Sequence, residues 1–296
     1  MKKLIAVLLV CVMCGTFFTG CDKQEKKELY NRIDNVTYGS NPLQKYDVVL
    51  PPTESANGGL FLFIHGGGWL GGSRVDIYTQ NLMTLYWKDG YTVASMDYEY
   101  AGPEVNMDTL LNDVKLALNS IYDQAESKGI TLKSALLIGW DAGAHLAELY
   151  AYKNANEAKI AVKCVCGYGG IGDLTDPSLY YGNMWNGILG QPLPTILSYL
   201  CGKEFTDETY KEAEAELKAI SPITYVDTAV PTIIGHGTED VYVPFSNSSA
   251  FQKALEEAKV PSKLIKFYHC DSTLLNDQES LVYSHQLWKE YAKQYF

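Results

Sequence analysis

Two glycine-containing stretches decide the fold of this chain, His65-Gly66-Gly67-Gly68-Trp69 and Gly139-Trp140-Asp141-Ala142-Gly143. Each stretch directly follows an apolar run, residues 60–64 in the first case and residues 134–138 in the second. An apolar run of five residues is typical of a buried strand, and glycine at its exit lets the chain turn sharply. The sequence therefore predicts two buried strands that each end in a loop with exposed backbone.

Further apolar runs alternate with helical patterns on both sides of these loops. The expected strands are residues 46–50, 60–64, 91–95, 134–138, 161–165, 232–234 and 263–268. The expected helices are residues 77–88, 107–128, 142–151, 207–219, 246–258 and 280–295. Such alternation predicts an α/β fold, with a mostly parallel central sheet and helices on both faces. Residues 175–210 interrupt the alternation and are expected to form a small insertion over the active-site end of the sheet.

The composition is that of a globular chain with no affinity for nucleic acid. Hydrophobic residues make up 47% of the 296 positions, which is enough for a core and excludes a disordered or fibrous protein. Asp and Glu total 35 against 24 Lys and Arg, so the formal net charge is −11. Only Arg32 and Arg74 can form bidentate phosphate contacts, and an acidic chain is repelled by a phosphate backbone.

The N-terminus has the pattern of an export signal. Lys2 and Lys3 precede residues 4–18, which are uncharged, mostly apolar and too few for a membrane span of about 20 residues. The Phe18-Thr19-Gly20-Cys21 sequence that follows resembles a bacterial lipoprotein cleavage box. We therefore expect a signal peptide at 1–20, a flexible tether at 21–36 and a folded domain at 37–296. Lipidation of Cys21 would hold the exported protein on the membrane of the bacterial cell envelope.

Four cysteines remain in the expected domain, Cys164, Cys166, Cys201 and Cys270. Their spacing is not that of zinc ligands, because no two of them form a C-x-x-C pair. Free buried thiols are the expectation. An oxidising compartment also permits disulfides, whose pairing the sequence leaves open.

A third loop motif, Gly235-His236-Gly237-Thr238-Glu239-Asp240, follows a late strand. With these three motifs at this spacing, nearly the whole chain after the signal resembles an α/β-hydrolase of the carboxylesterase, feruloyl-esterase-like (BD-FAE-like) and formamidase-like group. The resemblance implies the α/β-hydrolase fold and carboxylic ester hydrolysis, without a cofactor or a metal. In that family the N–H groups at Gly67, Gly68 and Ala142 would form the oxyanion hole, and Asp240 would orient the catalytic histidine.

Two of the three catalytic positions depart from the family pattern. Asp141 stands where G-x-S-x-G carries its nucleophilic serine. The slot of the catalytic histidine, counted from the end of the last strand, falls on Ser272 or Thr273. Neither hydroxyl can act as a general base at neutral pH. His269 is the only histidine nearby, and it lies three or four residues too early in the chain.

The Asp141 carboxylate would stand at a helix N-terminus and face the N–H donors of the glycine loop, which stabilise negative charge. We expect it to occupy the oxyanion hole itself, as a bound product would. The residues expected to line the pocket are Trp69, Trp140, Tyr180, Tyr181 and Trp185. The three aromatics of the insertion among them serve equally well to pack it down. The remaining histidines, His65, His145, His236 and His285, are expected to be structural.

Four functions fit this sequence. The first is a degenerate esterase whose pocket binds a small ester-like or aromatic ligand. The second is an active hydrolase in which Asp141 is the nucleophile and His269 the base. The third is a cation or metal site formed by Asp141 and Asp240, with or without His269. The fourth is a surface interaction module that uses the lipid anchor and the tyrosine-rich insertion.

Overall fold

The computed structural model describes residues 31–180, 190–206, 209 and 213–296. The expected signal peptide, Cys21 and most of the expected tether lie outside the described residues, as do Tyr181 and Trp185 of the insertion. Among the described residues, no helix is both long and apolar enough to cross a membrane.

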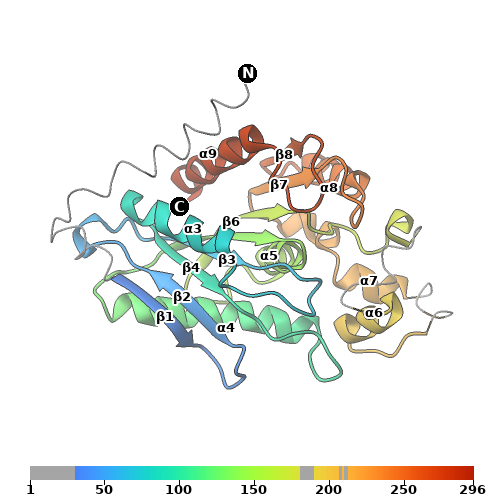
Figure 1. Cartoon of the computed structure of the whole chain (residues 1–296), viewed down its shortest axis with the longest axis horizontal. Coiled ribbons are helices and arrows are strands. Elements are labelled where there is room, and N and C mark those ends of the chain that lie inside the picture. The colour runs from blue at the N-terminus through green and yellow to red at the C-terminus, as the bar shows by residue number, and fades with distance from the viewer. Residues whose placement is uncertain (1–30, 181–189, 207–208, 210–212) are drawn as a thin grey trace, which may run out of the picture.

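One eight-stranded sheet forms the centre of the molecule, in the order β1-β2-β4-β3-β5-β6-β7-β8 (Figure 1). The strands are β1 (Arg32–Thr37), β2 (Lys45–Val49), β3 (Gly59–Ile64), β4 (Thr92–Met96), β5 (Ser134–Trp140), β6 (Ala161–Tyr168), β7 (Thr232–Gly237) and β8 (Ser262–Phe267). Only the pairs β1–β2 and β2–β4 are antiparallel, and the other neighbouring pairs run parallel. The expectation of a mostly parallel sheet is confirmed.

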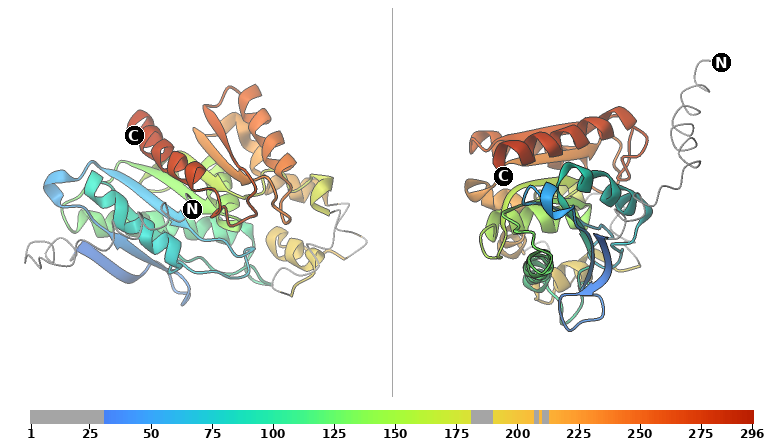
Figure 2. Two further views of the ribbon diagram at one scale, coloured as in Figure 1. Left: turned by 45° about the horizontal axis from the view of Figure 1, so that its top comes forward. Right: turned by 90° about the vertical axis from the view of Figure 1, so that its left-hand side faces the viewer.

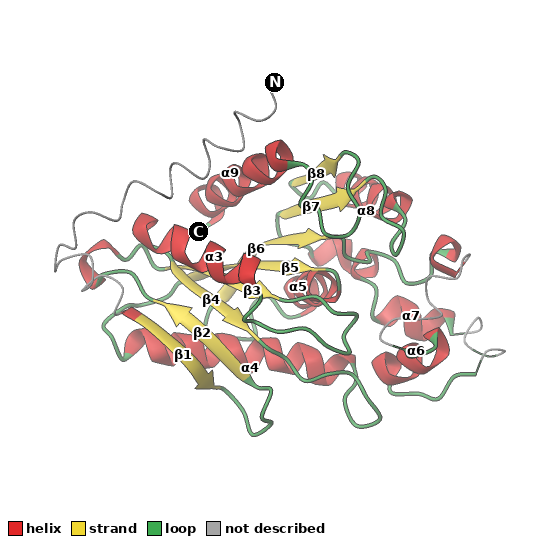
Figure 3. Cartoon of the chain, viewed as in Figure 1, coloured by secondary structure: helices red, strands yellow, loops and turns green. Residues whose placement is uncertain are grey.

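Helices cover both faces of this sheet (Figures 2 and 3). The described α-helices are α3 (Ile77–Tyr86), α4 (Met107–Glu126), α5 (Ala142–Lys153), α6 (Leu193–Cys201), α7 (Glu214–Ala219), α8 (Phe245–Glu257) and α9 (Gln278–Tyr295). Short 3₁₀ helices are η2 (Thr53–Ser55), η3 (Trp87–Asp89), η4 (Pro177–Tyr180) and η7 (Pro222–Thr228). Side chains alternate along β3, so that Leu62 packs with α4 and α5 while Phe61 and Phe63 pack with α3 and α9. All six residues of β3 are buried, which explains its uninterrupted apolar sequence.

Two sequence-based boundaries differ from the structure. The expected tether at 21–36 overlaps β1, so the folded domain includes residues from Arg32 onward and begins before residue 37. This strand was missed because it lies at the sheet edge, is half exposed, and its ladder is irregular between Ile33 and Val36. The helix expected at 207–219 is described only as α7, which begins at Glu214.

The four cysteines of the domain are free thiols in the structure, as expected. Cys164 and Cys166 are buried in β6, and the Trp288 indole N–H lies 3.3 Å from the Cys166 sulfur. Burial raises the pKa of the Cys166 thiol to about 12. These thiols therefore stay protonated and unreactive at neutral pH.

Helix α5 carries a buried acid against the sheet. Glu148 is 2% exposed, and a Cβ placed on Gly167 of β6 would come within 2.1 Å of its Oε1 atom. Its Oε2 atom has no hydrogen-bond partner within the described chain. Burial raises the pKa of Glu148 to about 8, so this side chain is protonated at neutral pH.

We expect Glu148 to make the fold less stable as the pH rises. Between its ordinary pKa of 4.5 and about 8, the folded state holds a proton that the unfolded state has released. Glu148 alone therefore lowers the free energy of unfolding by about 1.4 kcal/mol per pH unit within this window. Glu148→Gln should remove that contribution, and the difference from the wild type is clearest between about pH 7.5 and pH 8, where histidines with an ordinary pKa of about 6.5 are mostly neutral in both states. Urea denaturation at a series of pH values measures this, with exposed Glu126→Gln as the control, and a slope that stays unchanged in Glu148→Gln would contradict it.

Candidate active site

The turn from β5 into α5 places Asp141 at the carboxyl end of the sheet. Its backbone has φ 51° and ψ −120°, a conformation that costs about 1–3 kcal/mol for a residue with a side chain. Glycines make the turn possible, because a Cβ on Gly139 would come within 2.1 Å of the Gly143 carbonyl oxygen. A Cβ on Gly143 would likewise meet the carbonyl oxygen of Ile64 at 2.2 Å. The turn therefore projects one side chain, an acid, above the sheet.

The glycine-rich loop after β3 surrounds this carboxylate. Gly67 and Gly68 both have positive φ, which turns their N–H groups toward Asp141. The Gly67 nitrogen lies 2.8 Å and the Gly68 nitrogen 2.9 Å from the same oxygen, Asp141 Oδ2. Ala142, expected as a further donor, is the first residue of α5. The side chain of Asp141 thus occupies the donor pair that would hold a substrate oxyanion in an esterase.

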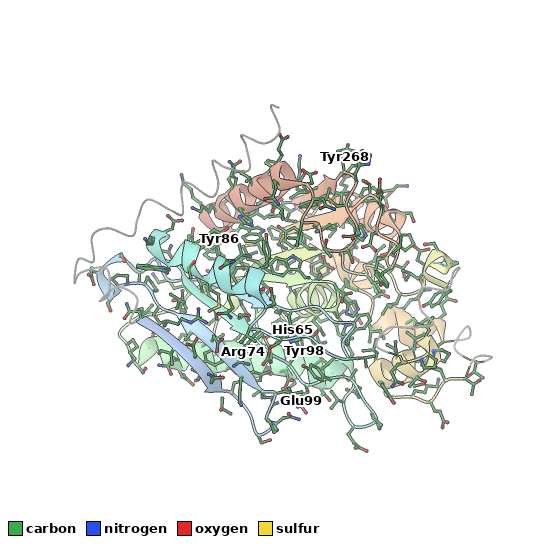
Figure 4. The ribbon with its side chains drawn as sticks, in the orientation of Figure 1. His65, Arg74, Tyr86, Tyr98, Glu99 and Tyr268 are labelled. Carbon is green, nitrogen blue, oxygen red and sulfur yellow. The ribbon has the colours of Figure 1, made fainter. Side chains whose placement is uncertain are left out.

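Two aromatic side chains hold the glycine loop in place. The His65 ring stacks on Tyr98 at a centroid distance of 4.3 Å, and the two lie side by side in Figure 4. Since the Gly66 carbonyl oxygen can only accept, His65 donates from Nδ1 to it over 2.7 Å. Burial lowers the pKa of His65, so the ring is neutral at pH 7. Trp69, expected in the pocket wall, is 2% exposed and packs edge-on against His145, so it belongs to the core.

The loop after β7 holds the carboxylate of Asp240 by one of its two oxygens. Asp240 Oδ1 accepts hydrogen bonds from the Tyr242 and Val243 N–H groups at 2.8 and 3.0 Å. Asp240 Oδ2 is buried and has no hydrogen-bond partner within the described chain. His236 Nε2 is 3.4 Å from it but donates to the Val243 carbonyl oxygen at 2.9 Å. One carboxylate oxygen of Asp240 is therefore buried without a hydrogen bond from the described residues.

The expected histidine slot lies beside that oxygen. A Cβ on Gly169 would lie 3.7 Å from Asp240 Oδ2 and 3.9 Å from the Ser272 carbonyl oxygen. Ser272 and Thr273 both line the cavity next to Asp141. The structure thus brings Asp141, Asp240 and Ser272 to one end of the sheet, where β5, β7 and the segment after β8 end.

His269 contacts Glu239 on the protein surface. Its side chain is 87% exposed, and Nδ1 lies 2.8 Å from Glu239 Oε1. Its backbone has φ 55°, and its N–H donates to the Thr238 hydroxyl oxygen at 3.0 Å. His269 pairs with a surface carboxylate and is not part of the cavity lining.

A cavity of about 330 Å³ opens beside Asp141. Trp140 and Tyr78 form its aromatic wall, with ring centroids 5.7 Å apart and planes at 89°. Tyr180, expected in this wall, instead donates from its hydroxyl to the Leu174 carbonyl and packs against the core. The lining residues are His65, Gly66, Gly67, Gly72, Ser73, Asp76, Tyr78, Thr79, Trp140, Ser272, Thr273 and Leu275.

Sequence reasoning missed Tyr78 and Asp76 in this wall. Asp76 caps α3 by accepting from the Thr79 N–H at 3.0 Å. An acid directly before a helical pattern is the sequence signal for such a cap, and it places the start of α3 beside the glycine loop. Tyr78 then follows in the first turn, and its hydroxyl is hydrogen-bonded to His285 Nε2 over 3.2 Å. Burial lowers the pKa of His285 to about 4, so this ring is neutral at pH 7.

A cation site at Asp141 and Asp240 receives no support from this geometry. Within the described residues, no group of three or more His, Cys, Asp or Glu side chains is arranged to hold a metal ion. Each carboxylate already faces two backbone N–H groups, whose positive ends would oppose a cation at the same oxygen.

Comparison with known proteins agrees with this arrangement. The BD-FAE family model matches residues 46–255, which include all three loop motifs. Esterase LipQ of Mycobacterium tuberculosis is 29% identical over 206 residues, which are 66% of this chain and 45% of that protein. Kynurenine formamidase of Salmo salar is 30% identical over 126 residues, 43% of this chain and 40% of that protein. The chain spans less than half the length of these two relatives.

The fold also matches solved structures. A truncated carbohydrate esterase from gut microbiota superposes with a TM-score of 0.71 at 17% identity, over 88% of this chain and 96% of that one. This likeness confirms the α/β-hydrolase fold. The family match covers more than half of the chain, and this protein therefore belongs to the BD-FAE family of carboxylesterase-like α/β-hydrolases.

Proposed function

We propose that this protein is an altered member of its family that has lost serine-type ester hydrolysis and uses its pocket to bind a small molecule. The observation that carries the proposal is the pair of hydrogen bonds from Gly67 and Gly68 to Asp141 Oδ2. A tetrahedral intermediate needs those two N–H groups for its own negative oxygen. A carboxylate fixed there competes with it and repels it.

The other two parts of the mechanism support the same conclusion. The hydroxyls of Ser272 and Thr273 cannot take the proton that a catalytic histidine would carry, and that step contributes about 10²–10⁴-fold to the rate. Removing one oxyanion donor costs about 10²–10³-fold, and here both donors are engaged. With the nucleophile, the base and the oxyanion hole all altered, acyl transfer by the serine route has no remaining support.

The alternative with Asp141 as nucleophile needs a histidine that activates water. The placement of His269 opposes this, because the ring is paired with Glu239 and exposed to solvent. The N–H donors at Asp141 Oδ2 also stabilise the negative charge that the two carboxylate oxygens share, which lowers the nucleophilicity of the carboxylate.

We expect the wild-type domain to show no esterase activity on short aryl esters. Asp141→Ser/Ser272→His should gain at least about 10²-fold over either single variant, because it supplies a nucleophile and a base beside a free oxyanion hole. Asp141→Ser/Thr273→His is the matched control that tests which position is the histidine slot. Turnover by the wild type that Asp141→Asn abolishes would disprove the proposal and favour the aspartate nucleophile.

The role of Asp141 as a fixed partner of the glycine loop also predicts its effect on stability. Asp141→Ala removes two charge-assisted hydrogen bonds, and we expect the free energy of unfolding to fall by about 2–4 kcal/mol. Urea denaturation measures the change, with exposed Asp227→Ala as the control for losing one acid. An effect of Asp141→Ala no larger than that of the control would show that the carboxylate does not hold the loop.

We propose further that the protein is exported and anchored by lipid at Cys21, on the support of the sequence pattern alone. In a bacterial host, Cys21→Ser should move the protein from the membrane fraction to a soluble one and abolish its labelling by a radioactive fatty acid. Lys23→Ser, two residues along the expected tether, should leave both unchanged. A wild-type protein that carries no label would rule out the anchor.

A further inference from the structure

We propose that the cavity beside Asp141 binds a small organic cation, a protonated amine attached to an aromatic or apolar group. This inference rests on the proposed function, because Asp141 here binds the ligand and does not attack it.

The cavity has negative charge and no positive side chain to balance it. Asp76 is part of the lining, and Asp141 lies between two lining segments, after Trp140 and in contact with Gly66 and Gly67. None of the lining residues is Lys or Arg. The nearby guanidinium of Arg74 is buried in ion pairs with Asp97 and Asp47. An anionic ligand would therefore be repelled, and a cationic one attracted.

His65 adds no positive charge to the wall. Its side chain is 4% exposed, and burial lowers its pKa, so the ring is neutral at pH 7. The lining residues therefore supply no cation of their own to Asp76 and Asp141.

Asp141, which contacts the lining residues Gly66 and Gly67, offers a hydrogen-bond acceptor beside the cavity. The N–H groups of Gly67 and Gly68 both donate hydrogen bonds to Asp141 Oδ2, and the hydroxyl of Tyr78 is hydrogen-bonded to His285. Within the described chain, no group donates to Asp141 Oδ1. A ligand that places N–H donors at this oxygen forms a charge-assisted bond, whereas an ester carbonyl finds both glycine donors taken.

The aromatic wall suits the same ligand. Trp140 stacks on Tyr168 with ring centroids 5.3 Å apart, and Tyr78 is tied to α9 through His285, so both rings are held in place. An ammonium group near a tryptophan or tyrosine face gains about 0.5–2 kcal/mol, and an aryl group gains contact area on the same rings. The volume of about 330 Å³ is at the small end of ligand pockets.

Calorimetric titration with a matched pair of probes tests this inference. 2-Phenylethylamine is protonated at neutral pH, and 2-phenylethanol has nearly the same shape without the charge. We expect the folded domain to bind the amine at least about tenfold more tightly than the alcohol, the effect of one charge-assisted hydrogen bond. Equal affinities, or no binding of the amine at millimolar concentration, would overturn the inference.

Two charge-neutralising variants locate the interaction. Asp141→Asn keeps an oxygen toward Gly67 and Gly68 but removes the charge, and it should lose most of the preference for the amine. Asp108→Asn makes the same change in net charge on α4, outside the lining of this cavity, and should keep the preference. A preference that survives Asp141→Asn would also overturn the inference. Ester hydrolysis measured on the same preparations separates a failure of this inference from a failure of the proposed loss of catalysis.

Discussion

The site depends on one contact, in which the carboxylate of Asp141 is held by the N–H groups of Gly67 and Gly68. The contact joins the ends of two neighbouring parallel strands, β3 and β5, which lie 74 residues apart in sequence at this point. The strained elbow at Asp141 and the positive φ angles of the glycine loop both serve to bring these groups together. In an esterase the N–H groups of such a loop bind the negative oxygen that forms on the substrate. In this chain the same N–H groups bind Asp141 Oδ2.

The acid loop shows the complementary change. Asp240 is still fixed by two backbone N–H groups, yet its second oxygen is buried without a partner, a costly condition for a carboxylate. Ser272 occupies the neighbouring segment and lines the cavity. Asp240 and Ser272 therefore lie at the same end of the sheet as Asp141, held there by the backbone of the loops that follow β7 and β8.

These two changes alter what the pocket can recognise. An empty oxyanion hole favours ligands that bring negative charge, whereas a filled one presents a carboxylate and leaves a negative cavity with an aromatic wall. The two nearby groups that could carry positive charge do not balance this cavity. His65 is neutral because it is buried, and the charge of Arg74 is paired with Asp47 and Asp97. The family scaffold is therefore compatible with a ligand of the opposite charge type, without any change in the position of its strands.

The sequence by itself determined the alternating fold, the three loops at the strand ends and the substitutions Asp141 and Ser272, because glycine spacing and apolar runs are local signals. It missed β1, since an edge strand buries too little surface to show a clear pattern. It placed Trp140 in the pocket wall, where the structure has it, but it also placed Trp69 and Tyr180 there and missed Tyr78 and Asp76. The direction of each side chain and the outward turn of His269 toward Glu239 were decided only by tertiary structure. They depend on contacts between segments that are distant in the chain, and no local sequence pattern records such contacts.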